Sequence, residues 1–186
     1  MNIVIGGIQG SGKGTQSKVL ASRYNLRHIS VGDCIYHYLV NEPEFVLPYT
    51  LEKYRAGELA PNDVVNRVTD RELRAGLDIG GFVLDGFPRQ HEQLDFLMSH
   101  IAKIDLFLFL EMSEDACVDR LMSRGRADDT VEGIRRRVDQ YTRLTYPVLE
   151  ALENLVPTHR IDASKPIDEV SEIIDSIVRY EFELIG

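Results

Sequence analysis

The sequence predicts an α/β fold in which a doubly wound, five-stranded parallel sheet is covered by helices on both faces. Short apolar runs alternate along the chain with segments of helical spacing, which is the pattern of such a sheet. A glycine-rich turn, GGIQGSGKG, joins the first apolar run to the first helical segment. The chain has 186 residues, 44% hydrophobic and 27% charged, which is the size and composition of one ordinary domain.

The glycine-rich turn joins a strand to a helix. Residues 2–5 are an apolar run typical of a buried strand, and helical spacing begins at Thr15. In this context the spacing G-x-x-x-x-G-K, from Gly7 to Lys13, is typical of a loop whose backbone N–H groups hold phosphates at a helix N-terminus. Lys13 adds a mobile charge for the outer phosphates. A turn with nothing bound is the alternative, and the agreement of strand, lysine and helix favours the phosphate loop.

The next segment predicts a short strand followed by two helices. Residues 26–30 read as the strand, and a helix over 32–40 carries Asp33 in its first turn, where the helix dipole favours an acid. A shorter helix over 49–56 is expected to end at Gly57, which can adopt the left-handed conformation of a helix stop.

The middle of the chain predicts two strands, each preceded or followed by a helix. A helix that begins at Pro61 and ends near Gly76 leads to a buried strand over 81–85. A helix over 90–100 then leads to a strand over 105–111, which is rich in leucine and phenylalanine.

The C-terminal part predicts three helices and the fifth strand. Ser113 caps a helix, and a long helix begins at Val131, with Pro147 as its expected kink. The strand over 158–162 precedes a last helix that starts at Pro166. The apolar stripes of the last two helices are Ile134, Val138, Tyr141, Thr145, Val148 and Leu152, and then Val170, Ile173, Ile174 and Ile177.

Composition excludes several classes of function. The net charge of −9 argues against a general binder of nucleic acid or of anionic membranes. Cys34 and Cys117 are far apart and are read as reduced thiols of a cytoplasmic protein rather than as metal ligands. The longest apolar run, residues 106–110, is too short to span a bilayer, and the N-terminus lacks the pattern of a signal peptide.

Three loops are expected to converge at the carboxyl edge of the sheet: the glycine loop, residues 30–33 and residues 85–89. Asp85 ends an apolar strand, which is the position of the acid that organises Mg²⁺ beside a phosphate loop. An aspartate that merely forms the turn before Gly86 is the alternative, and the neighbouring phosphate loop favours the Mg²⁺ role.

Arginines are the second signal. A surface arginine is usually solvated or paired with an acid, and Asp128 and Asp129 are available for that. Several arginines in an acidic chain with a phosphate loop favour the clamping of phosphates, because planar bidentate donors suit that task. The candidates are Arg89, Arg120, Arg124, Arg126 and Arg137.

Along nearly its whole length the sequence resembles the adenylate kinase family of nucleoside monophosphate kinases. The resemblance is carried by residues 7–16 (GIQGSGKGTQ), 30–33 (SVGD), 81–89 (GFVLDGFPR) with Gln93, and 124–130 (RGRADDT) with Arg137. It implies the P-loop nucleoside monophosphate kinase architecture, one domain over 1–186. The core would comprise 1–30, 61–123 and 131–186, with a monophosphate-binding insertion over 31–60 and a short lid over 124–130.

The resemblance also implies a division of roles. Gln93 would read the acceptor base, and Asp85 would hold Mg²⁺ through water. The implied catalytic residues are Lys13, Arg89, Arg124, Arg126 and Arg137. The implied ATP-binding residues are Gly10, Ser11, Gly12, Lys13, Gly14, Thr15, Arg120, Arg124 and Lys165. The implied AMP-binding residues are Val31, Tyr36, Glu58, Leu59, Ala60, Gly86, Phe87, Pro88, Arg89, Gln93, Arg126 and Arg137.

Two positions depart from the family pattern, both on the acceptor side. Val31 replaces a threonine, which removes a hydroxyl near the acceptor base. Tyr36 stands where the family carries an arginine for the acceptor phosphate, and a lost charged hydrogen bond costs about 1.5–3 kcal/mol. Tyr36 itself, Lys53 or Arg55 could supply a replacement donor, and the sequence leaves these alternatives open.

The function implied is reversible transfer of the γ-phosphoryl group from MgATP to AMP, giving two ADP. The expected partners are ATP and AMP or ADP, without nucleic acid or membrane, and the expected state is a cytoplasmic monomer. One alternative is a kinase of UMP, CMP or another monophosphate, because Val31 changes the base side. A further alternative is a nucleotide-binding module without turnover, for which Tyr36 is the motive.

Overall fold

The computed structural model describes residues 1–55, 58–100, 103–124 and 130–183, and the side chain of Arg124 lies outside this description. Gly57, Arg126 and residues 125–129 of the expected lid therefore lie outside the described residues as well. The strands are β1 (Asn2–Gly7), β2 (Arg27–Ser30), β3 (Phe82–Asp85), β4 (Leu106–Glu111) and β5 (Thr158–Asp162).

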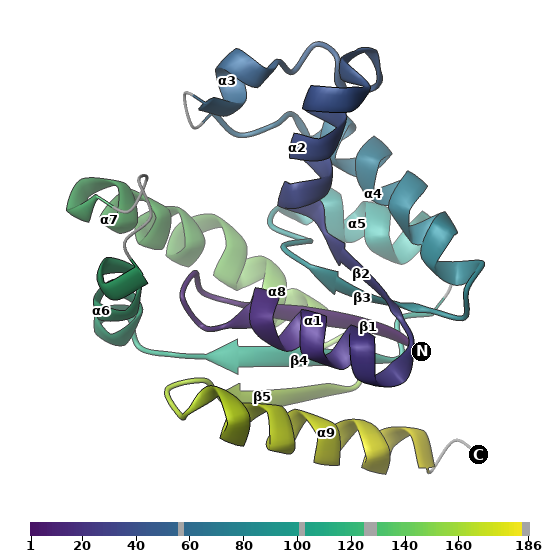
Figure 1. The fold of residues 1–186 in the computed structure, drawn as a ribbon, viewed down its shortest axis with the longest axis vertical. Coiled ribbons are helices and arrows are strands. Elements are labelled where there is room, and N and C mark those ends of the chain that lie inside the picture. Colours follow the sequence, from purple (N-terminus) through teal and green to yellow (C-terminus); the bar gives the residue numbers. More distant parts are fainter. Residues whose placement is uncertain (56–57, 101–102, 125–129, 184–186) are drawn as a thin grey trace.

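The described strands form one parallel sheet in the order β2-β3-β1-β4-β5. Its alternating side chains build two separate cores, as expected when both faces of a sheet are covered. Ile3 and Ile5 pack on one side with α1 (Lys13–Tyr24) and α9 (Ile167–Glu183). Val4 packs on the other side with the remaining helices. The doubly wound α/β sheet predicted from the sequence is confirmed (Figure 1).

The helices that pack on the Val4 side of the sheet include α2, which lies with α3 in the upper part of the molecule in Figure 1. There α2 and α3 stand beyond the edge of the sheet, joined to it by β2 and α4. The bounds are α2 (Val31–Asn41), η1 (Pro43–Val46), α3 (Leu51–Arg55), α4 (Asn62–Leu77), α5 (His91–His100), α6 (Glu114–Arg124), α7 (Val131–Gln140), η2 (Tyr141–Thr145) and α8 (Tyr146–Glu153).

The predicted elements occur with small shifts at their ends, and one prediction needs correction. The long helix expected from Val131 is not an α-helix kinked at Pro147: it contains the π-helical segment η2, and Pro147 lies in the first turn of α8. Pro147 has no N–H to donate to the carbonyl of Arg143, and the helix widens just before it, with the N–H of Tyr146 donating to the carbonyl of Tyr141. Thr145 is consequently only half-buried.

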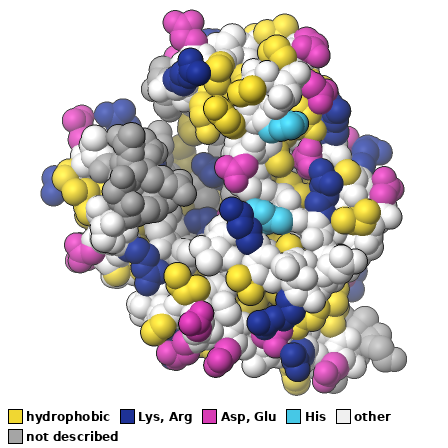
Figure 2. All heavy atoms as spheres, viewed as in Figure 1, with side chains coloured by type: hydrophobic (Ala, Val, Ile, Leu, Met, Phe, Trp, Pro, Cys, Tyr) yellow, Lys and Arg dark blue, Asp and Glu magenta, His cyan; other side chains and the backbone are white. Residues whose placement is uncertain are grey.

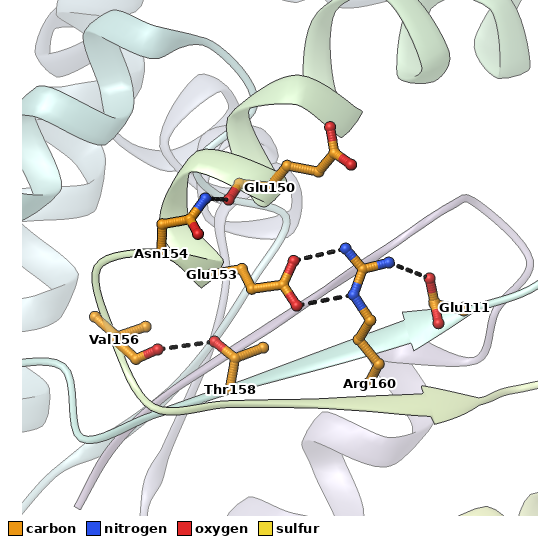
Figure 3. A network of polar contacts seen from close by, with 7 residues as sticks. All are labelled: Glu111, Glu150, Glu153, Asn154, Val156, Thr158 and Arg160. Atoms are coloured by element: carbon orange, nitrogen blue, oxygen red, sulfur yellow. Dashed lines mark hydrogen bonds and ion pairs between the residues drawn. The ribbon is translucent and has the colours of Figure 1, made fainter.

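A network around Arg160 fixes α8 to the sheet (Figure 3). The guanidinium donates to both carboxylate oxygens of Glu153, at 2.8 and 2.6 Å, and to Glu111 at 2.6 Å. It also lies over the Phe109 ring, 4.9 Å from the centroid. Because Glu153 belongs to α8 and Glu111 to β4, this one side chain joins two elements that lead to the site described below.

We expect Arg160→Ala to lower the free energy of unfolding by about 1–2 kcal/mol, because a bidentate pair and a ring contact are lost together, although solvent screens the pair. Urea denaturation measures this change. The matched control is Arg143→Ala, which removes an exposed pair with Asp139 at 2.8 Å and should cost less than about 0.5 kcal/mol. Equal effects for the two variants would contradict the role given to Arg160.

Candidate functional site

The glycine loop between β1 and α1 is forced into its path by close packing. Gly7 has φ +141°, and a Cβ there would lie 2.3 Å from the carbonyl oxygen of Leu110 on β4. Gly10 and Gly12 have φ of +88° and +87°, in the left-handed region that glycine adopts without strain. Glycine at these positions therefore allows the chain to turn tightly at the carboxyl edge of the sheet and present backbone N–H groups at the start of α1.

Lys13 is the first residue of α1, and its ammonium group folds back over the loop. Its Nζ donates to the carbonyl oxygen of Ile8 at 2.8 Å. Burial lowers the pKa of Lys13 to about 8, although the nearby carboxylate of Asp85 opposes this shift. The loop thus holds a poorly solvated cation that gains from any anion placed beside it.

Asp85 ends β3 next to the loop, as the sequence predicts. Ser30 on β2 and Ile5 on β1 flank it in register. Its side chain is buried, and burial raises its pKa against the opposing charges of Lys13 and Arg89. A Cβ on Gly14 would lie 3.5 Å from its Oδ2. The carboxylate therefore faces the start of α1, where a phosphate-bound cation would lie.

A cavity of about 350 Å³ opens beside the loop, between the upper helices and the sheet. Figure 2 shows the molecule hollowed at this level, with Lys or Arg side chains inside the hollow. Val31, Ile35, Tyr54 and Leu59 give it an apolar wall from the upper part of the molecule. The other lining residues are Gln9, Gly32, Tyr49, Glu58, Ala60, Val65, Gly86, Arg89, Gln90, Gln93, Arg137, Gln140, Tyr141, Leu144 and Thr145.

A smaller cavity of about 40 Å³ lies between the large cavity and the glycine loop, and Lys13 lines it. The two cavities share residues, so they are neighbours in space. The shared lining residues are Gln9, Gly86, Arg89, Tyr141 and Thr145. Lys13 and Arg89 thus face the same small space, although they are far apart in the sequence.

The carboxamide of Gln93 is held in one orientation at the wall of the large cavity. Its Oε1 accepts from the backbone N–H of Arg89 at 2.8 Å, and its Nε2 donates to Oδ1 of Asn62 at 2.8 Å. Asn62 in turn donates to the carboxylate of Glu92 at 2.8 Å. An N–H can only donate and a carboxylate can only accept, so the two ends of this chain fix both amides.

The candidate arginines are placed at different parts of the site. Arg89 and Arg137 line the large cavity. Arg120 bridges the glycine loop and the turn after β5, donating to Gly10 at 3.3 Å and to Ala163 at 3.0 Å. Arg126 and the side chain of Arg124 lie outside the described residues.

The remaining sequence candidates outside the glycine loop differ in which cavity, if any, they line. Val31, Glu58, Leu59, Ala60, Gly86 and Gln93 line the large cavity, whereas Phe87 and Pro88 line only the small one. Tyr36 lines neither: it is exposed and packs on Tyr54, with ring centroids 5.3 Å apart. Lys53 and Arg55, the alternative donors, do not line the large cavity either. Lys165 forms an ion pair with Glu169 in the turn after β5.

Sequence reasoning missed the aromatic and aliphatic wall of the cavity. Ile35, Tyr49, Tyr54, Tyr141 and Leu144 line it without belonging to a recognisable motif. Their only signal was apolar side chains in segments next to the strand ends, which is equally typical of an ordinary core.

Two other features are absent from the described residues. Within the described ranges, no group of three or more His, Cys, Asp or Glu side chains could hold a metal ion by itself. Nor does any helix in the described part of the chain have the length and hydrophobicity needed to cross a membrane.

Comparison with known proteins gives a consistent result. The model of the family "Adenylate kinase" matches residues 4–156. The chain is 37% identical to an adenylate kinase of Nocardia farcinica, over 92% of this chain and 96% of that protein. It is similar to adenylate kinases of Oenococcus oeni (34%, covering 95% and 97%) and Porphyromonas gingivalis (33%, covering 96% and 95%).

The lowered pKa of Lys13 predicts that polyphosphate binding takes up protons. A polyphosphate raises the pKa of this ammonium again, so at pH 8 to 9 binding should be accompanied by proton uptake, and affinity should fall as pH rises through 8. Calorimetry of tripolyphosphate binding in buffers of different ionisation enthalpy measures the uptake. Lys13→Met should abolish it, and uptake that persists in this variant would assign it to another group.

Proposed function

This chain belongs to the adenylate kinase family and is an enzyme that transfers a phosphoryl group between ATP and AMP, and we propose that the two adjoining cavities are where this transfer occurs. The large cavity would hold AMP, and the glycine loop with the small cavity would hold the ATP phosphates. The reaction is reversible and gives two ADP. The comparisons do not favour a kinase of UMP or CMP, or a module without turnover.

The observation that carries this proposal is the shared boundary of the two cavities. Lys13 reaches the small cavity from the glycine loop, and Arg89 reaches it from the turn after β3 while also lining the large cavity. A phosphoryl group that passes from one nucleotide to the other must cross such a boundary, and positive charge there stabilises the developing negative charge.

The proposed mechanism is direct in-line transfer. The glycine loop and Lys13 hold the donor phosphates, and Arg120 fixes the loop through the carbonyl of Gly10. Arg89 and Arg137 orient the acceptor phosphate. One of its oxygens attacks the γ-phosphorus while the bond from that phosphorus to the β,γ-bridging oxygen breaks, so that the donor leaves as ADP and the acceptor becomes ADP. No side chain forms a covalent bond to the substrate in this scheme. Arg124 and Arg126 are proposed to contribute further charge from outside the described residues.

The residues beside the loop fit a magnesium ion bound with ATP. Asp85 presents a buried carboxylate toward the start of α1, and the exposed hydroxyl of Thr15 lies in the same first turn. Magnesium prefers such oxygen ligands and usually keeps several waters, which suits an Asp85 contact through water. When bound, the ion would neutralise charge on the donor phosphates.

Gln93 is proposed to read the acceptor base. Its fixed orientation leaves one lone pair on Oε1 and one N–H on Nε2 for a ligand. Adenine offers an amino group beside a ring nitrogen acceptor, which matches this pair. Hypoxanthine offers a carbonyl beside an N–H, which does not.

Several further features complete the proposal. Residues 31–60 would be the acceptor-binding insertion and residues 124–130 a short lid, and both would close to exclude water before transfer. We expect a monomer in the cytoplasm, with nucleotides as its only required partners. The thiols of Cys34 and Cys117 are free in the structure, which is compatible with a reducing compartment.

A coupled assay of ADP formation from MgATP tests the function directly, with AMP, UMP, CMP and IMP as separate acceptors. Among these four acceptors, only AMP is expected to give ADP. Binding of ATP without ADP formation from any acceptor would contradict enzymatic function. Lys13→Met should abolish turnover, because the charge beside the donor phosphates is lost. Retention of most activity would show that the glycine loop is assigned wrongly.

The orientation of Gln93 predicts a preference for AMP over IMP. Gln93→Leu should lower kcat/KM for AMP about 10- to 100-fold, the value of one bidentate pair, and leave kcat/KM for IMP nearly unchanged. The steady-state kinetics of both acceptors measure the change. An equal loss for both acceptors would indicate that Gln93 supports the cavity wall without reading the base.

A further inference from the structure

Gln9 stands at the boundary of the two cavities and has no assigned role. It lines both the large cavity and the small one, as only a few other residues do. Its side-chain oxygen Oε1 is buried and has no hydrogen-bond partner among the described residues. A buried acceptor without a donor destabilises the folded protein, so the position calls for an explanation.

The backbone around Gln9 is held firmly. The carbonyl oxygen of Ile8 accepts from Nζ of Lys13 at 2.8 Å and from the N–H of Ser11 at 3.2 Å. The carbonyl oxygen of Gln9 itself accepts from Sγ of Cys117. The side chain therefore projects from a fixed point of the loop, and its lack of a partner does not come from a disordered segment.

The two buried glutamines, Gln16 and Gln93, show what a satisfied carboxamide looks like in this protein. Gln16 donates to the carbonyl of Ile167 at 2.9 Å and accepts from Ser171 at 2.7 Å. Gln93 is bonded at both of its polar atoms. Gln9 differs in that it lines both cavities and its Oε1 has no hydrogen-bond partner among the described residues.

The charges at this boundary define what Gln9 can bind. Arg89 lines both cavities with it, and Lys13 lines the small one. These side chains have donors only, whereas phosphates have acceptors only. A neutral carboxamide carries one of each, so it can accept from a guanidinium and donate to a phosphate without adding charge.

We propose that Gln9 contacts the phosphoryl group while it is transferred from ATP to AMP. In the loaded enzyme Nε2 donates to an oxygen of the transferring group, and Oε1 accepts from the guanidinium of Arg89. This inference rests on the proposed function of the two cavities. It assigns to the glycine loop a side-chain contact with the reacting atoms in addition to its backbone N–H groups and Lys13.

Gln9→Met and Gln9→Glu test the proposal, because both replacements are close to glutamine in size. Gln9→Met should lower kcat about 10- to 100-fold with the KM for ATP within about twofold of the wild type, since the contact forms in the transition state. Gln9→Glu should lower kcat further, because a carboxylate would face the phosphates.

Thermal unfolding of the free protein separates this role from a structural one. Gln9→Met should raise Tm, because it removes a buried acceptor that has no donor. The matched control, Gln16→Met, should lower Tm, because it removes a glutamine whose bonds are made. A structural role for Gln9 would lower both Tm and kcat in Gln9→Met, and this result would overturn the proposal.

The kcat values of the two Gln9 variants can also overturn the proposal. A kcat for Gln9→Met within twofold of the wild-type value would overturn the role of Gln9 and leave the function of the enzyme intact. Gln9→Glu as active as Gln9→Met would likewise overturn it. A wild-type protein that forms no ADP would instead refute the proposed function itself, so the two failures are distinguishable.

Discussion

The close approach of β1 and β4 at Gly7 is the constraint on which the site depends. Because a side chain there would overlap the carbonyl of Leu110, the strand can pack only with glycine, and the chain turns into the loop at that point. The neighbouring strands β3 and β2 end at the same edge, with Asp85 and Ser30 in register. The sheet thus brings three loops to one place before any ligand is involved, as a parallel sheet does at its carboxyl edge.

The positive charge of the site depends on which groups hold the cationic side chains at this edge of the sheet. Lys13, Arg89 and Arg120 donate to backbone carbonyls, of Ile8, Gly86 and Gly10 respectively. Several arginines away from the site pair with carboxylates instead, as Arg160 does with Glu153. A carbonyl positions a cation without neutralising it, so the site keeps its positive charge within a chain of net charge −9. That local charge is what a polyphosphate needs to bind against the overall field.

The sequence was sufficient for the sheet, the path of the glycine loop and the placement of Asp85 at the end of a strand, because each rests on a local pattern of residues. It was insufficient where the result depends on packing between segments. The π-helical turn before Pro147 arises from a carbonyl that loses its donor, and the pattern of apolar residues does not show how the helix adapts. The orientation of Gln93 depends on Asn62 and Glu92, and the wall residues Tyr49 and Leu144 lack any motif.

The two departures from the family pattern, Val31 and Tyr36, acquire a common meaning in the structure. Val31 lies in the apolar wall of the large cavity, and Tyr36, which does not line the cavity, packs against Tyr54 of that wall. The wall from residues 31–60 is therefore mainly apolar, whereas Arg89 and Arg137 add positive charge to the lining from other elements. Under the proposed function, a monophosphate in such an asymmetric cavity would direct its phosphate toward the arginines and its base toward the apolar wall and Gln93. In this proposal the asymmetry would orient the acceptor for attack even though Tyr36 does not line the cavity, because Arg89 also lines the small cavity proposed for the donor phosphates.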